Sequence, residues 1–336
     1  MKILVIKRDK IGDMLLTTPL LSHLRMALPN AQIDMLANDY NAWVVEGHPA
    51  INRLWVYRRA RVGRKIRLFA AIAQLRQTFQ LRLQHYDVAI IAGGEESPRA
   101  TKRVLRIGAT RTIGFCSSAQ CKRAISDPLD PLRSLHEVDR MLHLLQPLGI
   151  NPPTEPIYPK FSPAAAVVDT ARRWLTERKL SKYIVIGLGA RRAKKQPSTE
   201  QVLRWAEYFF KQWKLPTVFM WTPGPGNNVV YPGDDEVAEP LLRAQREYIY
   251  PFRGALQPAI GLIWQARCSI FPDSGLMHFA ACSPGGVLGL FADTSVSPSP
   301  VQWGPVGPRA RILEAQLAVA ELRDEQIFNE IENLLN

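Results

Sequence analysis

One stretch decides how the chain is interpreted: Phe271-Pro272-Asp273-Ser274-Gly275-Leu276-Met277-His278-Phe279-Ala280-Ala281. An apolar segment with β-branched and aromatic residues arrives at small and polar residues, and a helical pattern leaves from them, which predicts strand, tight turn and helix. Gly275 lets the backbone pass close to a ligand, and the first N–H groups of the helix attract phosphate. Asp273 and His278 flank the turn. A plainer alternative is that Asp273 or Ser274 only caps the helix.

The length and composition predict a two-domain protein. The chain has 336 residues, with 46% hydrophobic and 22% charged residues, as in globular proteins. This length exceeds one ordinary core and suits two domains. The sequence has no apolar segment long enough to span a membrane, and residues 1–6 enter a strand pattern without a signal-peptide cleavage site. We therefore expect a cytoplasmic location.

The four cysteines fit that location. Cys116 and Cys121 lie close in sequence without a second Cys/His pair nearby, while Cys268 and Cys282 lie in apolar segments. We expect reduced, mostly buried thiols, and a zinc site is the less favoured alternative.

The positive charge is concentrated in the first half. The net charge is +13, and residues 1–150 contain 23 Lys and Arg against 12 Asp and Glu, while the remainder contains 20 against 18. Such a surface faces nucleic acid, an acidic membrane surface or a phosphorylated substrate, although a basic surface also serves solubility.

The N-terminal segment begins like a βαβ unit. Residues 2–7 form a strand pattern, residues 8–13 a loop, and residues 14–25 an amphipathic helix pattern. The loop lacks the glycines of a dinucleotide fingerprint and of a P-loop. Asp13 lies at the carboxyl end of the strand, where open α/β sheets place working residues, and is placed to accept a proton from an attacking hydroxyl. The alternative is a first-turn aspartate stabilised by the helix dipole.

Further strand patterns alternate with helical ones and predict a mostly parallel sheet covered on both faces. In the first half they lie at residues 32–36, 53–57, 87–92 and 112–115. The densest basic cluster, residues 58–67, leads into an amphipathic helix that ends near Leu83. It is either a solvated face or a site that captures phosphate or carboxylate.

A proline-rich segment separates the two halves. Five prolines lie in residues 151–163, which excludes a helix or a central strand. We therefore predict a first domain over residues 1–150, a linker over 151–163, a second domain over 164–318 and a last helix within 319–336.

The second half repeats the βα pattern. Strands are predicted at residues 183–190, 217–221 and 287–291, and Ser198 or Thr199 caps the helix that follows the basic loop 191–197. That loop is placed to reach a pyrophosphate. The acidic residues 234–236 follow Pro232-Gly233, so the helix dipole explains them better than a metal does. We predict no metal site.

Taken together, several separated motifs are similar to glycosyltransferase family 9, the ADP-heptose:lipopolysaccharide heptosyltransferases. The motifs are Gly12-Asp13-Met14-Leu15-Leu16-Thr17-Thr18-Pro19-Leu20, His136 at a helix start, Gly189-Ala190 with Lys194 and Pro197, Asp273-Ser274-Gly275-Leu276-Met277-His278, Leu290-Phe291, and Trp303-Gly304-Pro305. They occur in this order and extend over nearly the whole chain.

The resemblance implies a fold and a site. The fold is α/β, with two Rossmann-like domains whose parallel sheets face across a cleft, known as GT-B, and a final helix that packs back on the first domain. The reaction is inverting and uses neither a metal nor a cofactor. Asp13 is the general base. The donor-binding residues are Gly189, Ala190, Lys194, Asp273, Ser274, Gly275 and His278. A basic first domain suits an anionic lipopolysaccharide acceptor, so we expect the acceptor-binding residues to be Lys10 and, in the basic cluster, Arg58, Arg59, Arg61, Arg64 and Lys65.

The expected partners are a nucleotide sugar and an anionic lipopolysaccharide core. We expect a monomer, and we expect the basic cluster also to hold it at the inner face of the cytoplasmic membrane. Arg191 and Gln196 stand where family members commonly have Ser and Trp, and residues 296–300 lengthen the loop before Trp303. An alternative is therefore the same chemistry with another nucleotide sugar, or with a protein or other glycan as acceptor. A non-catalytic nucleotide- or nucleic-acid-binding protein is a third hypothesis, but aromatic residues do not interleave with the basic cluster, and we expect no nucleic acid.

Overall fold

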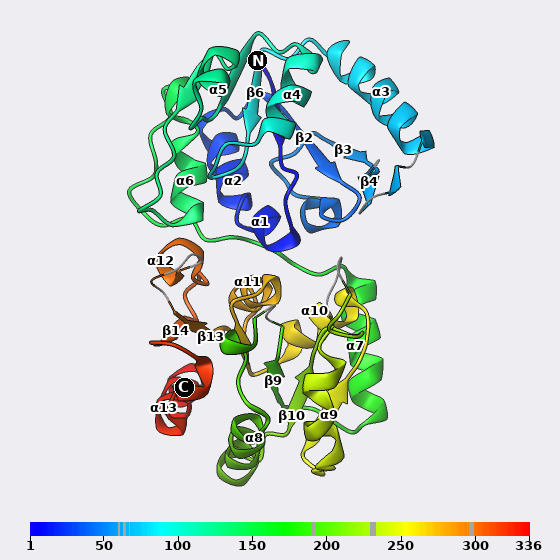
Figure 1. Cartoon of the computed structure of the whole chain (residues 1–336), viewed down its shortest axis with the longest axis vertical. Coiled ribbons are helices and arrows are strands. Elements are labelled where there is room, and N and C mark those ends of the chain that lie inside the picture. The colour runs from blue at the N-terminus through cyan, green and yellow to red at the C-terminus, as the bar shows by residue number, and fades with distance from the viewer. Residues whose placement is uncertain are drawn as a thin grey trace. The chain divides into compact units, whose positions relative to one another are not determined.

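The chain folds into two compact units, each built around its own sheet. The computed structural model describes residues 1–59, 61–62, 65–66, 68–189, 192–228, 233–293, 295 and 299–336, and for 61–62 and 65–66 it describes the backbone only. Unit 1 is Met1–Lys160 and unit 2 is Phe161–Asn336 (Figure 1). The division falls inside the predicted linker, residues 151–163, which contains no helix or strand.

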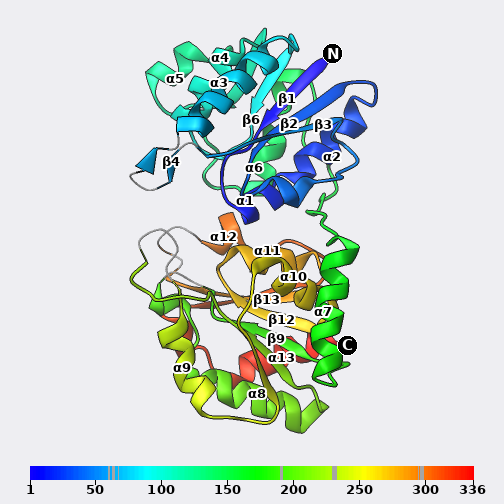
Figure 2. The same cartoon turned by 90° about the vertical axis from the view of Figure 1, so that its right-hand side faces the viewer.

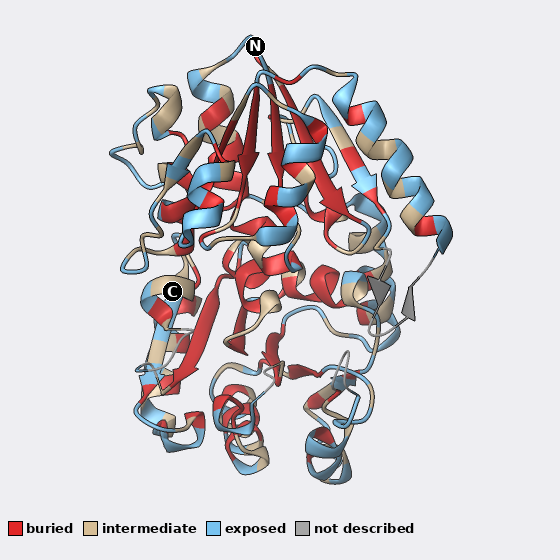
Figure 3. Cartoon of the chain, turned by 45° about the horizontal axis from the view of Figure 1, so that its top comes forward, coloured by how far each residue is buried: buried red, intermediate tan, exposed pale blue. Residues whose placement is uncertain are grey.

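Unit 1 contains a parallel sheet. Over the residues that the structure describes, the sheet has six strands in the order β3-β2-β1-β6-β7-β8. Ile3 of the central strand pairs with Ile33 on one side and Val88 on the other. The strands are β1 (Lys2–Ile6), β2 (Gln32–Asn38), β3 (Arg53–Tyr57), β6 (Val88–Ile91), β7 (Arg111–Phe115) and β8 (Asp127–Leu129). Most of their residues are buried, as the red strands of Figure 3 show.

Helices cover both faces of this sheet. α2 and α6 pack together on one face, and α3, α4 and α5 lie on the other (Figure 2). The helices are α1 (Ile11–Leu15), α2 (Thr18–Ala27), η1 (Ala42–Val45), α3 (Leu68–Arg82), α4 (Pro98–Ile107), α5 (Ala119–Ala124), α6 (Glu137–His143) and η2 (Gln146–Leu148). The backbone of β4 (Arg61–Val62) pairs with that of β5 (Lys65–Ile66) in an antiparallel hairpin.

Unit 2 repeats the architecture. Counted over its described residues, its parallel sheet also has six strands, in the order β11-β10-β9-β12-β13-β14. The strands are β9 (Ile184–Gly187), β10 (Thr217–Met220), β11 (Ile249–Phe252), β12 (Cys268–Pro272), β13 (Val287–Ala292) and β14 (Ala310–Ala315). The helices are α7 (Ala165–Glu177), η3 (Ala193–Lys195), α8 (Thr199–Trp213), α9 (Asp235–Arg243), α10 (Leu256–Gln265), α11 (Gly275–Ala281), α12 (Pro300–Trp303), η4 (Val319–Glu321) and α13 (Asp324–Leu335). In the described part of the chain, no helix is long and apolar enough to cross a membrane.

The last helix belongs to the core of unit 2. α13 buries Ile327, Ile331 and Leu334 in one hydrophobic cluster with residues of α8 and the sheet. Its start is fixed by Asp324, which accepts hydrogen bonds from Trp205 Nε1 at 2.7 Å and Arg204 Nε at 2.5 Å. The apolar side of α13 is therefore covered by its own unit.

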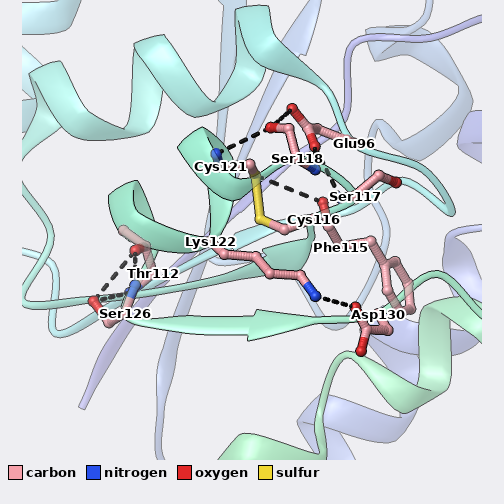
Figure 4. The surroundings of a disulfide bond; sticks show 10 residues. All are labelled: Glu96, Thr112, Phe115, Cys116, Ser117, Ser118, Cys121, Lys122, Ser126 and Asp130. Carbon is pink, nitrogen blue, oxygen red and sulfur yellow. Dashed lines mark hydrogen bonds and ion pairs between the residues drawn. A yellow bond between two sulfur atoms is a disulfide. The ribbon is translucent and has the colours of Figure 1, made fainter.

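Two cysteines expected to be reduced are joined. Cys116 follows β7 directly and Cys121 lies in α5, and their sulfur atoms form a disulfide (Figure 4). Ser118 Oγ accepts a hydrogen bond from Cys121 N at 3.1 Å, so the turn brings the two Cα atoms to 5.4 Å, within disulfide range. Cys268 and Cys282 take no part in this disulfide, and Cys268 is buried.

Candidate functional site

The carboxyl end of β1 carries the first group of polar side chains. Lys7 continues the pairing to β2 through its backbone N–H, which donates to Leu36 O at 3.1 Å. The loop that follows is held by two buried asparagines: Asn38 Nδ2 donates to Arg8 O at 2.8 Å, and Asn41 Nδ2 donates to Asp9 O at 3.0 Å. The loop is therefore fixed before α1 begins.

Asp13 has the structural role that its sequence position allows, in the first turn of a helix. It lies in the first turn of α1, where its Oδ2 accepts a hydrogen bond from Lys10 N at 2.9 Å. Burial raises the pKa of this carboxyl, while Lys7 and the hydrogen bond from Lys10 oppose that rise. A carboxylate with a raised pKa accepts a proton more readily than an ordinary one, which suits a general base.

Lys7 is a buried cation facing three carboxylates. Its side chain is 1% exposed, and its Nζ lies 3.2 Å from Asp9 Oδ2. Burial disfavours the ammonium, but the charges of Asp9, Asp13 and Glu137 outweigh this and raise the pKa of Lys7. Lys7 therefore stays charged and places a fixed positive charge beside Asp13.

Glu137 joins this group from α6, and sequence analysis did not identify it. It accepts a hydrogen bond from Gly94 N at 3.1 Å and pairs with the fully buried Arg140, whose Nη1 lies 3.2 Å from Glu137 Oε2. Arg140 also donates to Gly94 O and contacts Glu95 Oε1 at 2.8 Å. Burial raises the pKa of Glu137. The charged pair thus ties α6 to the loop after β6.

In unit 2, the turn after β12 holds an ion pair that the sequence did not predict. Asp273 Oδ2 lies 2.6 Å from Nζ of Lys195, which is 8% exposed. Ser274 occupies the N-cap position of α11, but its buried Oγ has no hydrogen-bond partner within the described residues. Ser274 therefore has the N-cap position that the capping hypothesis expects, but neither Asp273 nor Ser274 makes a capping hydrogen bond through its side chain.

The ends of β9 and β13 approach the same turn. A side chain at Gly189 would meet Ser274 Oγ at 3.5 Å, so Gly189 lies beside that hydroxyl. Lys194 of η3 forms an ion pair with Asp293, at the end of β13, and this hydrogen bond lowers the pKa of Asp293. His278 lies on α11 and is buried. The structure thus brings Gly189, Lys194, Asp273, Ser274, Gly275 and His278 to one edge of the sheet. Ala190 lies outside the described residues.

The predicted acceptor residues are described only in part. Arg58 is exposed, and Arg59 Nε lies 3.4 Å from Asp39 Oδ1, with its guanidinium 5.2 Å from the centre of the Tyr40 ring. Lys10 is exposed. The predicted roles of Arg61, Arg64 and Lys65 fall on side chains outside the described part.

The acidic residues at the start of α9 have protein partners. Asp234 accepts a hydrogen bond from Gln196 Nε2 at 2.8 Å. Asp235 accepts from Trp221 Nε1 at 2.7 Å and from Arg253 Nη2 at 2.9 Å, and the Arg253 hydrogen bond holds the pKa of Asp235 far below its usual value. These contacts explain the acidic cluster as part of the fold of unit 2.

Two known proteins have sequences similar to that of this chain. "Lipopolysaccharide heptosyltransferase 3" of Escherichia coli strain K12 is 30% identical over 141 residues, which is 41% of this chain and 40% of the relative's length. A second Escherichia coli protein of that name is 26% identical over 298 residues, 84% of this chain and 81% of the relative.

Solved structures agree on the fold. A glycosyl transferase family 9 protein of Veillonella parvula superimposes with a TM-score of 0.83 at 20% identity, covering 99% of this chain and 97% of the other. The E. coli ADP-heptose lps heptosyltransferase II superimposes with a TM-score of 0.76 at 20% identity, covering 100% and 98%. The fold is therefore the α/β, GT-B fold of the heptosyltransferases.

The model of glycosyltransferase family 9 (heptosyltransferase) matches residues 73–331, which include the Asp273–His278 turn, both lysines of η3 and Glu137. This chain belongs to glycosyltransferase family 9.

Proposed function

We propose that this protein transfers heptose from ADP-heptose to an acceptor in the inner core of lipopolysaccharide, by an inverting reaction without a metal ion or other cofactor. The observation that carries the proposal is the pair of lysines at the carboxyl edge of the second sheet. Lys194 and Lys195 are each held by an aspartate, and the buried Oγ of Ser274 lies next to Asp273. The names of the similar E. coli proteins support the choice of heptose.

The lysines suit the departure of a nucleoside diphosphate. When the bond between the sugar and the diphosphate breaks, negative charge develops on the phosphate oxygens. Two preorganised ammonium groups stabilise that charge in place of a divalent ion. Ser274 Oγ and the N–H of Gly275 supply neutral hydrogen bonds to the same group, and Gly189 leaves room for it. His278, on the same short helix, completes the proposed donor set.

Asp13 is the proposed general base. Its carboxylate takes the proton of the acceptor hydroxyl, whose oxygen forms a bond to the anomeric carbon from the side opposite the leaving group. The bond from that carbon to the diphosphate oxygen breaks, and ADP leaves with the electron pair. The raised pKa of Asp13 makes its carboxylate a stronger base than an exposed one.

The basic part of unit 1 suits an anionic acceptor. Lys10, Arg58 and Arg59, with Arg61, Arg64 and Lys65, provide cations for the carboxylates and phosphates of an inner core. Arg59 exchanges its contact with Asp39 for such a group. We place the protein, as a monomer, in the cytoplasm and at the inner face of the cytoplasmic membrane.

A second candidate keeps the chemistry and changes the donor. Gln196 stands where the family commonly has Trp, and in this structure it is hydrogen-bonded to Asp234 beside the proposed donor residues. A changed nucleotide or sugar is the functional alternative that this contact favours.

Calorimetric titration with ADP, UDP and GDP, with and without Mg²⁺, tests the donor. We expect selective binding of ADP that Mg²⁺ does not change and that Lys194→Ala and Asp273→Ala each weaken at least about tenfold. Lys182→Ala, which removes an exposed lysine of the same unit, is the matched control and should bind ADP like the wild type. A preference for UDP or GDP would select the second candidate, and binding of none of them would refute the donor site.

A measurement of turnover distinguishes the proposed transferase from a non-catalytic binding protein. Asp13→Asn should lower transfer to a lipopolysaccharide-core acceptor by about 10³-fold and leave ADP binding unchanged, because Asp13 acts on the acceptor. Retained turnover would reject Asp13 as the base. Salt-dependent DNA binding by a protein without turnover would favour the non-catalytic hypothesis.

A further inference from the structure

α3 presents its apolar side chains to solvent. Leu68, Phe69, Ile72, Leu75 and Phe79 are exposed, with Phe69 at 88% and Leu75 at 64%, and Leu83 follows directly after the helix. Their spacing of three or four residues puts most of them on one side of the helix. α3 is largely pale blue at the right of Figure 3. This surface is a row of large apolar groups without a covering element in the described chain.

The inner side of α3 is held largely by polar contacts. Gln74 Nε2 donates to Arg58 O at 2.5 Å, and Gln77 Nε2 donates to Val56 O at 2.8 Å. The buried apolar residues of the helix are Ala70 and Leu81. The helix is therefore inverted relative to an ordinary surface helix, whose apolar side faces the core.

A cationic groove lies beside this row. Its volume is about 370 Å³, and its walls come mainly from α3 and α4. It is lined by Arg8, Ala71, Gln74, Leu75, Thr78, Arg99, Lys102, Arg103 and Arg106. Five of these nine residues are cations and none is acidic. Leu75 belongs to both the apolar row and the groove, so the two features are one continuous surface.

The groove has a defined structure, because Arg103 at its centre is held in place by neighbouring side chains. Arg103 Nη2 donates to Gln74 Oε1 at 2.6 Å, and its guanidinium lies 3.9 Å from the centre of the Tyr57 ring. Arg8 Nε donates to the hydroxyl of the same tyrosine at 3.1 Å. Burial, together with the charges of Arg8 and Arg106, lowers the pKa of Arg103. Like charges gathered in this way favour an anionic ligand.

One partner accounts for both features. A second copy of this chain would bring two cationic grooves together, and nucleic acid would leave the apolar row exposed to water. The surface of an anionic bilayer offers phosphates to the cations and an apolar layer to the side chains. Residues 58–86 contain no Asp or Glu that would repel it.

We propose that α3 and the groove between α3 and α4 form a docking surface for an anionic phospholipid bilayer. The apolar row enters the boundary between headgroups and acyl chains, and Arg99, Lys102 and Arg106 bind headgroup phosphates. The proposal deepens the membrane location given under the proposed function and rests on it. It assigns that location to residues other than the basic cluster 58–67.

Vesicle flotation tests the proposal without donor or acceptor, so that its failure is distinguishable from failure of the transfer reaction. The wild type should bind vesicles of phosphatidylcholine with phosphatidylglycerol and not vesicles of phosphatidylcholine alone. Lys102→Gln with Arg106→Gln should lower binding about 30-fold. Phe69→Ser with Phe79→Ser should lower it at least about tenfold.

Matched variants elsewhere serve as controls. Lys182→Gln with Arg246→Gln removes two exposed cations, and Met26→Ser with Leu317→Ser removes two exposed apolar side chains, at 64% and 67% exposure. Both should bind like the wild type. Equal binding to both kinds of vesicle, or equal losses in the control variants, would overturn the proposal. The proposal would also be overturned if an α3 variant lost self-association in sedimentation experiments but still bound vesicles, because the surface would then contact a second copy of the chain.

Discussion

Asp13 makes the first-turn contact of the plainer interpretation, and it is also the proposed general base. Its hydrogen bond to Lys10 N is the first-turn contact that the plain interpretation expects. The same carboxyl stands beside the buried ammonium of Lys7 and under the influence of Asp9. The helix-start contact fixes its position, while burial, together with the surrounding charges, sets its proton affinity, so the structural role is compatible with the proposed one.

Replacing Lys7 should change the pH dependence of the reaction. The charge of Lys7 lowers the pKa of Asp13, so Lys7→Met should raise that pKa further. A base is active when deprotonated, and activity is lost as the pH falls through its pKa. The acidic limb of the kcat/KM profile should therefore move to higher pH, by at least about one unit. Lys7→Arg, which keeps the positive charge, should leave the acidic limb at its wild-type pH.

The pH profile of kcat/KM also distinguishes an effect of Lys7 on the pKa of Asp13 from a purely structural role of Lys7. Lys122→Met, which removes an exposed lysine paired with Asp130, should leave the acidic limb in place. A Lys7→Met protein that is folded by circular dichroism and has an unshifted limb would contradict the assignment of Asp13 as a base tuned by Lys7.

Gly94 is required by the buried pair around Arg140. A Cβ atom there would lie 2.3 Å from Glu137 Oε2 and 2.7 Å from Arg140 Cζ, and both side chains are almost fully buried. Gly94→Ala should reduce the free energy of unfolding by about 3 kcal/mol, measured by urea denaturation. At the adjacent Gly93 the nearest atom to such a Cβ lies at 3.7 Å, so Gly93→Ala should stay within about 0.5 kcal/mol of the wild type. Equal losses in both variants would exclude this steric explanation.

At the scale of elements, most strands could be predicted, and three edge strands of the two six-stranded sheets could not. β1, β7, β10 and β13 lie at or within a residue of the predicted bounds because they are short, buried apolar segments. The edge strand β3, which is only partly buried, also has the predicted bounds. The strands β8, β11 and β14 escaped prediction. The first two contain Pro128 and Pro251, and β14 contains Arg311 and Glu314, residue types that sheets tolerate at their edges.

The positions of the candidate site residues could be predicted where a sequence motif marks a strand end. They could not be predicted where the role of a residue depends on its burial in the folded protein. Gly189, Ser274 and Gly275 lie at the strand ends that their sequence motifs indicate. By contrast, nothing in the sequence distinguishes Lys195, held by Asp273, from Lys194, held by Asp293. The cation Arg140 and its partner Glu137 looked like ordinary surface residues of an amphipathic helix. Their burial follows from the packing of α6 against the sheet, which is a long-range property.

The disulfide between β7 and α5 should stabilise unit 1. Closing a loop of this size restricts the unfolded chain and contributes about 2 kcal/mol. Cys116→Ala with Cys121→Ala should therefore reduce the free energy of unfolding by about that amount in urea. Dithiothreitol should cause the same loss in the wild type and none in the double variant. Identical unfolding of the wild type with and without the reductant would show that the bond contributes nothing to stability.

At the scale of the whole molecule, each unit has its own cores. The clusters around the two faces of the second sheet draw only on residues of unit 2, and the cluster under α3, α4 and α5 draws only on unit 1. We therefore expect stability to be local to each unit, and a ligand that binds one unit should stabilise that unit first.

Two buried-to-small substitutions test this independence. Ile331→Ala in α13 and Met141→Ala in α6 each remove a fully buried side chain and should cost about 3 kcal/mol in their own unit. Measured by peptide-resolved hydrogen exchange, Ile331→Ala should speed exchange in residues 161–336 and leave residues 1–160 unchanged, while Met141→Ala should do the reverse. ADP at 100 times its dissociation constant should restore about 2.7 kcal/mol in the Ile331→Ala protein and nothing in the Met141→Ala protein, because the proposed donor residues lie in unit 2. Faster exchange in residues 1–160 of the Ile331→Ala protein would mean that α13 also stabilises unit 1, as the sequence alone had suggested.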